Sequence, residues 1–168
     1  AETRKYLVDI MLATAGWDVG PNGKTTPHVG QEVKVLHQGT KSGEGFADYV
    51  LWGDDGKPLA VVEVKKTAKE PSLGRKQAQG YADGLEKDHG CRPVIFYTNG
   101  FDLWIWNDHK DVDEPDRLLR GGFYSKDSLE YLHFQRSEAK DLLDPEALKA
   151  TKAIAGRHYQ RKALKQVL

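Results

Sequence analysis

Cysteine and methionine are almost absent from this chain of 168 residues, which contains one of each. The single cysteine, Cys91, excludes an internal disulfide and a cysteine-based metal site, and it fits a reducing compartment. The six histidines are scattered and lack the spacing of a zinc site. We therefore expect a cytoplasmic protein.

Long hydrophobic runs and an excess of one charge are also missing. No apolar stretch approaches the length of a membrane span and no signal peptide is visible, so we expect no membrane partner. With 25 basic and 25 acidic residues the net charge is +0, and only the local distribution of charge can favour nucleic acid. The length suits one domain. Because Ala1 already lies inside a helical pattern, we expect a fragment of a longer protein.

One stretch, from Gly45 to Lys66, organises the chain. It predicts two strands, 46–52 and 58–66, joined at Asp54-Asp55-Gly56, where glycine permits the positive φ of a tight turn. Side chains alternate along a strand, so Glu63 and Lys65 are expected on one face of the second strand. The first strand carries a second carboxylate, Asp48.

The remaining pattern predicts an α/β fold, with a central mixed sheet of about five strands flanked by helices and a small helical appendage after residue 124. A loop is expected over 39–45, which lacks the ending of a phosphate-binding loop, and another over 108–123. Asn99-Gly100 predicts a second hairpin. The expected helices are 2–15, 72–88, 125–135, 144–155 and one that begins at 157, and the other expected strands are 29–37, 92–98 and 101–107.

The helix over 72–88 carries Gln77 and Tyr81 one turn apart, on a face that also contains Gly80 and Gly84. Glycine inside a helix costs about 1 kcal/mol relative to alanine, so these glycines indicate close approach to the sheet. Gln77 and Tyr81 then either face the carboxylates or fill a packing seam, and spacing favours neither. The aromatic residues of 101–107 could stack on bases, but their spacing favours the core.

Two carboxylates on adjacent strands can hold Mg²⁺ or Mn²⁺, and a lysine beside them can orient water or stabilise a phosphorane. The pattern thus predicts Asp48 and Glu63 as metal ligands and Lys65 as the catalytic lysine of a phosphodiester hydrolase. The alternative is a surface ion pair of Glu63 with Lys65, which is worth little. Basic residues gather nearby and suit either a phosphate backbone or the solvated start of a helix: Lys65, Lys66, Lys69, Arg75 and Lys76.

The block G-F-A-D-Y-V-L…P-L-A-V-V-E-V-K-K resembles the core of the PD-(D/E)XK nucleases. More specifically, it resembles the N-terminal nuclease domain of the motor (restriction, R) subunit of type I restriction enzymes. The stretches E-T-R-K-Y-L-V-D-I-M-L, Q-A-Q-G-Y-A and R-P-V-I-F-Y-T-N-G-F-D-L-W-I-W are similar to the same family. The resemblance covers roughly residues 1–108, and its specificity comes from the motifs together.

The resemblance implies the same roles for Asp48, Glu63 and Lys65, and it makes Gln77 and Tyr81 a supporting Q-x-x-x-Y element. It adds Glu2 as a possible support of the metal site. Phe46 departs from the family, where a basic residue often stands before Ala-Asp. The implied activity is Mg²⁺-dependent endonucleolytic cleavage of double-stranded DNA, coupled in the intact enzyme to ATP-driven translocation. The implied partners are the methyltransferase (M) and specificity (S) subunits.

The end of the chain, G-R-H-Y-Q-R-K-A-L, resembles the opening of the family's helicase-like motor, where Tyr159 and Gln160 would lie near the adenine of ATP. No Walker A sequence is present, so ATP is expected only in the full-length protein. The predicted domains are a nuclease domain over 1–124, a helical linker over 125–156 and the start of a truncated motor over 157–168. Two alternatives remain: a degenerate nuclease fold that only binds DNA or docks, and a stand-alone repair or junction-resolving nuclease.

Overall fold

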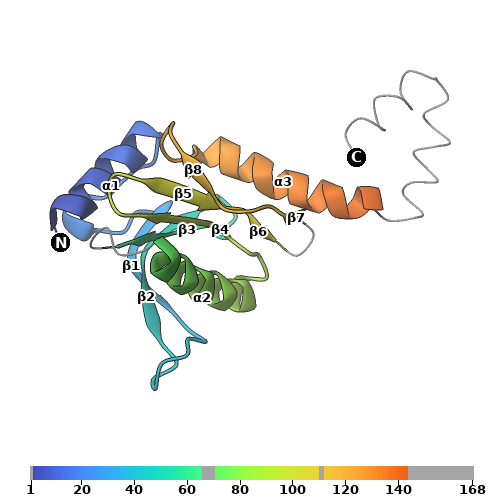
Figure 1. Ribbon diagram of the computed structural model, residues 1–168, viewed down its shortest axis with the longest axis horizontal. Helices are drawn as coiled ribbons and strands as arrows, with labels where there is room; N and C mark the ends of the chain where they lie inside the picture. The colour runs from blue at the N-terminus through green and yellow to red at the C-terminus, as the bar shows by residue number, and fades with distance from the viewer. Residues whose placement is uncertain (1, 66–70, 110–111, 144–168) are drawn as a thin grey trace.

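The computed structural model describes residues 2–65, 71–109 and 112–143, and the side chains of 2–4, 22, 71–73, 112–113 and 138–143 are outside this description. Within it the expected helices and hairpins form, with bounds within a few residues of those predicted at most ends (Figure 1). The elements are α1 (Glu2–Thr14), η1 (Pro21–Gly23), β1 (Val29–Val35), β2 (Gly45–Trp52), β3 (Pro58–Val64), α2 (Pro71–His89), β4 (Val94–Thr98), β5 (Leu103–Trp106), β6 (Asp108–His109), β7 (Val112–Asp113), β8 (Arg117–Leu119) and α3 (Lys126–Leu143).

The main sheet has six strands in the order β1-β2-β3-β4-β5-β8, and β6 pairs with β7 beside it. Among the described strands only the β3–β4 pair is parallel, because α2 carries the chain from the end of β3 back to the start of β4. The other neighbours are antiparallel. The predicted mixed α/β sheet is confirmed.

The expected loop over 108–123 is wrong in part. It contains β6 and β7, which pair with each other, and β8, which pairs with β5 through Leu103 and Leu119. β8 is three residues long and mostly exposed, so it carries no alternation for a pattern to detect. Both predicted hairpin turns form, with φ of 73° at Gly56 and 90° at Gly100, angles that glycine adopts without a steric cost. The predicted loop over 39–45 is confirmed up to Gly45, where β2 begins.

The helices cover the two faces of the sheet separately, α2 on one face and α1 with α3 on the other (Figure 1). Val8 and Leu12 of α1 and Leu129 of α3 pack against Tyr49, Phe96 and other side chains in one core. Ala78, Tyr81, Ala82 and Leu85 of α2 pack against a second core that contains Val50, Val61 and Ile95. No helix among the described residues is long and apolar enough to cross a membrane.

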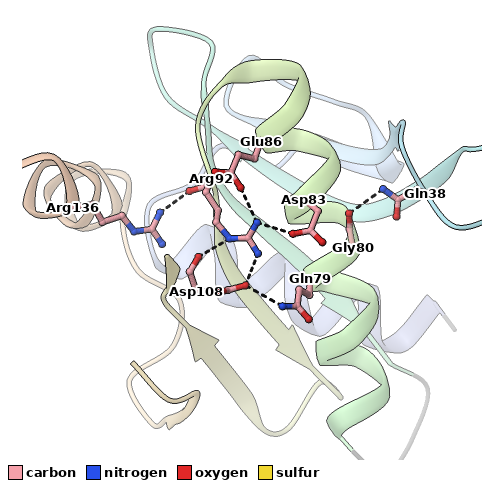
Figure 2. A network of polar contacts seen from close by, with 8 residues as sticks. All are labelled: Gln38, Gln79, Gly80, Asp83, Glu86, Arg92, Asp108 and Arg136. Carbon is pink, nitrogen blue, oxygen red and sulfur yellow. Dashed lines mark hydrogen bonds and ion pairs between the residues drawn. The ribbon is translucent and has the colours of Figure 1, made fainter. Parts of the chain in front are cut away.

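α2 and α3 are tied to the same end of the central strands through Arg92, which lies just before β4 (Figure 2). The Arg92 guanidinium donates to Asp83 and Glu86 of α2, at 2.8 and 2.9 Å, and to Asp108 of β6. The main-chain oxygen of Arg92 accepts a hydrogen bond from Arg136 of α3 at 2.6 Å. This bracket fixes both helical layers to the ends of β4 and β5.

Candidate active site

The two carboxylates predicted from the sequence lie on neighbouring strands of one face of the sheet. Val50 of β2 stands opposite Val61 of β3, and both belong to the core beneath α2. Two positions further along each strand, alternation places Asp48 and Glu63 on that same face. Val62 and Val64 pack in or against the core on the opposite face, as the alternation predicts.

Glu63 is 3% exposed, and its two oxygens have different surroundings. Oε1 accepts a hydrogen bond from Lys65 Nζ at 2.6 Å, whereas Oε2 is buried and has no hydrogen-bond partner within the described residues. Burial raises the pKa of Glu63 to about 7, because desolvation and the charge of Asp48 together outweigh the stabilising hydrogen bond from Lys65. A buried carboxylate oxygen without a hydrogen-bond partner is stabilised either by a proton or by a bound cation.

Asp48 is held in place by main-chain geometry. Its Oδ2 accepts a hydrogen bond of 2.7 Å from the N–H of Val64, the residue after Glu63. The side chain is only partly buried, so the face of Asp48 toward solvent stays accessible. The two carboxylates therefore differ: Asp48 is accessible and anchored, and Glu63 is enclosed.

α2 brings Gln77 and Tyr81 to this cluster. Gln77 Oε1 accepts a hydrogen bond from Lys65 Nζ, and Gln77 Nε2 donates to Tyr81 OH at 2.8 Å. The Tyr81 ring lies against Gly45 at the start of β2, where an added Cβ would come within 2.7 Å of the ring. Both readings left open by the sequence therefore hold in part, since Tyr81 fills a seam while Gln77 contacts the lysine.

The predicted basic residues have several placements. Lys76 is exposed on α2, whereas Arg75 lies with its guanidinium 4.0 Å from the centre of the Trp106 ring. Lys66 and Lys69 are outside the described residues, as are Tyr159, Gln160 and the expected helices after 143. The backbone of Glu2 belongs to α1, but its side chain is outside the description. The roles of all these residues stay predictions.

Two residues near the cluster were not foreseen. Tyr97 of β4 is the parallel-register partner of Glu63, and its hydroxyl donates to Asp116 Oδ2 just before β8. The sequence gives no signal for this contact, because it depends on the parallel pairing of β3 with β4 and on the undetected strand β8. Of the aromatic residues expected in the core over 101–107, Trp104 and Trp106 are half-buried, while Phe101 is 85% exposed.

The residues present fit a hard divalent cation. The orphaned Glu63 Oε2 beside the accessible carboxylate of Asp48 supplies two oxygen donors of the kind that Mg²⁺ prefers, and Mg²⁺ usually takes its remaining ligands from water and phosphate. No group of three or more His, Cys, Asp or Glu side chains able to hold a metal occurs in the part of the chain that the structure describes. The cluster thus provides a two-carboxylate site.

No family model matches the chain, and no curated protein sequence matches it significantly. Among solved structures, the chain is similar to a fragment assigned as an HsdR subunit of a type I restriction enzyme from Vibrio vulnificus YJ016, with 24% identity and a TM-score of 0.56. The match covers 84% of this chain and 27% of that one, so the chain spans about a quarter of its neighbour's length. This likeness shows a restriction-endonuclease-like fold.

The chain is also similar to the type IIG restriction endonuclease BpuSI, with 16% identity and a TM-score of 0.42. That match covers 83% of this chain and 16% of the other.

Proposed function

We propose that this chain is a Mg²⁺-dependent nuclease domain that cleaves double-stranded DNA. The observation that carries the proposal is the orphaned, buried Glu63 Oε2, next to Asp48 and Lys65 on one sheet face. A surface ion pair would leave Glu63 solvated, but its side chain is 4% exposed against 33% for Lys65. The restriction-endonuclease-like fold supports the same reading.

In this proposal Asp48 and Glu63 hold the cation, whose chemistry is to lower the pKa of a bound water and to neutralise charge on the scissile phosphate. Lys65 is held by Glu63 Oε1 and Gln77 Oε1, so its ammonium is preorganised beside the carboxylates. From there it can donate to the attacking water or to a phosphate oxygen as negative charge develops. Gln77 is in turn held by Tyr81, which gives the Q-x-x-x-Y element a positioning role.

We further propose that the domain belongs to the restriction subunit of a type I enzyme, because the HsdR fragment shares the fold and the sequence motifs resemble that family. In that setting ATP-driven translocation would be performed by the motor of the full-length subunit. The M and S subunits would be separate proteins that assemble with it. Contacts with DNA would go to phosphates, so binding would weaken steeply with salt.

The test is a calorimetric titration with Mn²⁺ of the wild type, Asp48→Asn and Glu63→Gln, with Glu44→Gln as the matched control. Glu44 is also a carboxylate near β2, but it precedes that strand and pairs with Lys34 of β1. We expect saturable binding in the wild type and in Glu44→Gln, and at least a tenfold weaker binding in the two site variants.

Binding that survives in both site variants would contradict the proposal. If the wild type binds no Mn²⁺ alone, the titration is repeated with a short DNA duplex, whose phosphate can complete the coordination. Absence of binding there would exclude an intact metal site and leave a degenerate nuclease fold.

A further inference from the structure

The first part of α2 is pinned to the sheet by four side chains, which we call the Asp116 clamp: Arg75, Tyr97, Trp106 and Asp116. The Tyr97 hydroxyl donates to Asp116 Oδ2, and Arg75 Nε lies 3.5 Å from the same oxygen. The Arg75 guanidinium also stacks on Trp106, at 4.0 Å from the ring centre. The clamp thus joins α2 to β4, β5 and the segment before β8.

The clamp lies directly beside the candidate lysine. Gly74 precedes Arg75, and a Cβ added at Gly74 would lie 3.0 Å from Lys65 Cγ and 3.8 Å from Tyr97 Cβ. The stem of Lys65 therefore runs between α2 and the sheet, at the closest approach that a residue without a side chain allows. Any movement of this turn of α2 changes the space in which Lys65 lies.

The contacts of Arg75 are those of a positioning residue. An ion pair whose side chains are 40% and 24% exposed contributes little to stability by itself. Its geometry is nevertheless specific, since a planar guanidinium can stack on an indole while it faces a carboxylate, which an ammonium cannot do equally well. With its guanidinium against Trp106 and Asp116, Arg75 is turned away from the role of a simple phosphate contact.

We propose that the Asp116 clamp positions Lys65, by setting the distance between α2 and β3 so that the ammonium is held between Glu63 and Gln77. The catalytic consequence rests on the nuclease function proposed above. Arg75, Tyr97 and Asp116 are then positioning residues that act through Gly74 and touch no substrate.

The test measures how fast acetic anhydride labels Lys65 in the folded chain, by mass spectrometry, with the exposed Lys57 as the internal reference. Tyr97→Phe keeps the ring and removes one hydroxyl, and Asp116→Asn keeps the shape and removes the charge. We expect either change to raise the Lys65 rate about threefold to tenfold relative to Lys57, as loss of one hydrogen bond would. The matched control is Arg117→Gln, an arginine that also contacts a tyrosine hydroxyl, on β8, and it should change nothing.

A second pair of variants separates positioning from phosphate binding. Arg75→Lys retains the positive charge, and Arg75→Gln removes it. If the clamp is correct, both raise Lys65 labelling, because neither restores the stacked guanidinium. Wild-type labelling in Arg75→Lys would overturn the clamp and show that the positive charge alone matters. Wild-type labelling in both Tyr97→Phe and Asp116→Asn would also overturn the clamp. Tyr97→Phe decides the matter if Asp116→Asn fails to fold.

This experiment uses no metal and no DNA, so it fails separately from the proposed function. Faster Lys65 labelling together with a failed Mn²⁺ titration would retain the clamp and remove the nuclease assignment. Unchanged labelling together with Mn²⁺ binding would do the reverse. When both hold, cleavage by the clamp variants should show a lower kcat with nearly unchanged Mn²⁺ affinity, because these variants retain both carboxylates and Asp48 is held by the N–H of Val64.

Discussion

At the scale of single residues, Glu63 is where the proposed function and the stability of the fold oppose each other. Its carboxylate is buried and accepts a hydrogen bond from Lys65 on Oε1, whereas Oε2 has no hydrogen-bond partner among the described residues. Such a group destabilises the fold unless it is protonated or bound to a cation. The carboxylate that the proposed function uses as a metal ligand therefore lowers the stability of the fold when it is ionised and no cation is bound.

The pKa of Glu63, raised from 4.5 to about 7 mainly by burial, predicts a pH dependence of stability. The folded state holds this proton more tightly than the unfolded state, so the stability it confers is complete below pH 4.5 and is lost as pH rises through 7. The difference between the folded and unfolded pKa values corresponds to about 3 kcal/mol. In urea unfolding without divalent ions, we expect the free energy of unfolding of Glu63→Gln to exceed that of the wild type by roughly this amount at pH 8. Near pH 4.5 the two free energies should be equal.

Adding Mn²⁺ at pH 8 should stabilise the wild type more than Glu63→Gln, because the variant retains only the Asp48 carboxylate as a cation ligand. Equal stabilities of the two proteins at pH 8 in the absence of metal would show that Glu63 is solvated. That result would favour the surface ion pair over the enclosed carboxylate.

At the scale of elements, α2 shows why a helix with three internal glycines is maintained. Cβ atoms would meet different neighbours along its length: at Gly84 the main-chain oxygen of Leu36 at 2.4 Å, but at Gly80 only the Gln38 amide oxygen at 3.2 Å. Backbone cannot yield, whereas a flexible side chain can. The glycines therefore allow the helix to lie close to β1 and to keep Gln77 within reach of Lys65.

This difference predicts opposite effects for one substitution at two positions of the same helix. Gly84→Ala should lower the free energy of unfolding by about 1–3 kcal/mol, because the methyl group forces α2 away from β1. Gly80→Ala should be neutral or stabilise by up to about 1 kcal/mol, from helix propensity. Urea unfolding measures both, and equal effects would show that propensity alone decides.

The sequence predicted the local elements well because their signals are local. Asp54-Asp55-Gly56 and Asn99-Gly100 specify turns within a few residues. Lys65 follows the last residue of β3, and its ammonium contacts Glu63 as the predicted alternation requires. β8 was not predicted because it is short and mostly exposed. The hydrogen bond from Tyr97 to Asp116, just before β8, was therefore not predicted either. Contacts that depend on register between distant strands have no local pattern, so a sequence alone cannot reveal them.

At the scale of the whole molecule, hydrogen bonds of Arg92 join the two helical layers on opposite faces of the sheet, at one end of the central strands (Figure 2). The connections are of two kinds. The Arg92 side chain donates hydrogen bonds to α2 and β6, whereas its main-chain oxygen accepts one from Arg136 of α3. Arg136 is 5% exposed, burial lowers its pKa to about 10, and it also donates to Asn107 Oδ1 at 2.8 Å.

Side-chain changes should therefore separate the layers. Arg92→Gln removes the contacts to α2 and β6 and leaves the main-chain acceptor for α3, so we expect a loss of about 2 kcal/mol and faster amide exchange in the second half of α2 only. Asn107→Ala leaves the buried Arg136 with fewer acceptors, so we expect a loss of about 3 kcal/mol and faster exchange in α3. Hydrogen exchange read by mass spectrometry distinguishes the two patterns. If both variants raise amide exchange in α2 and α3 together, the contacts of Arg92 and Arg136 form one cooperative unit. A displacement of α3 would then be transmitted to α2, the helix that carries Gln77.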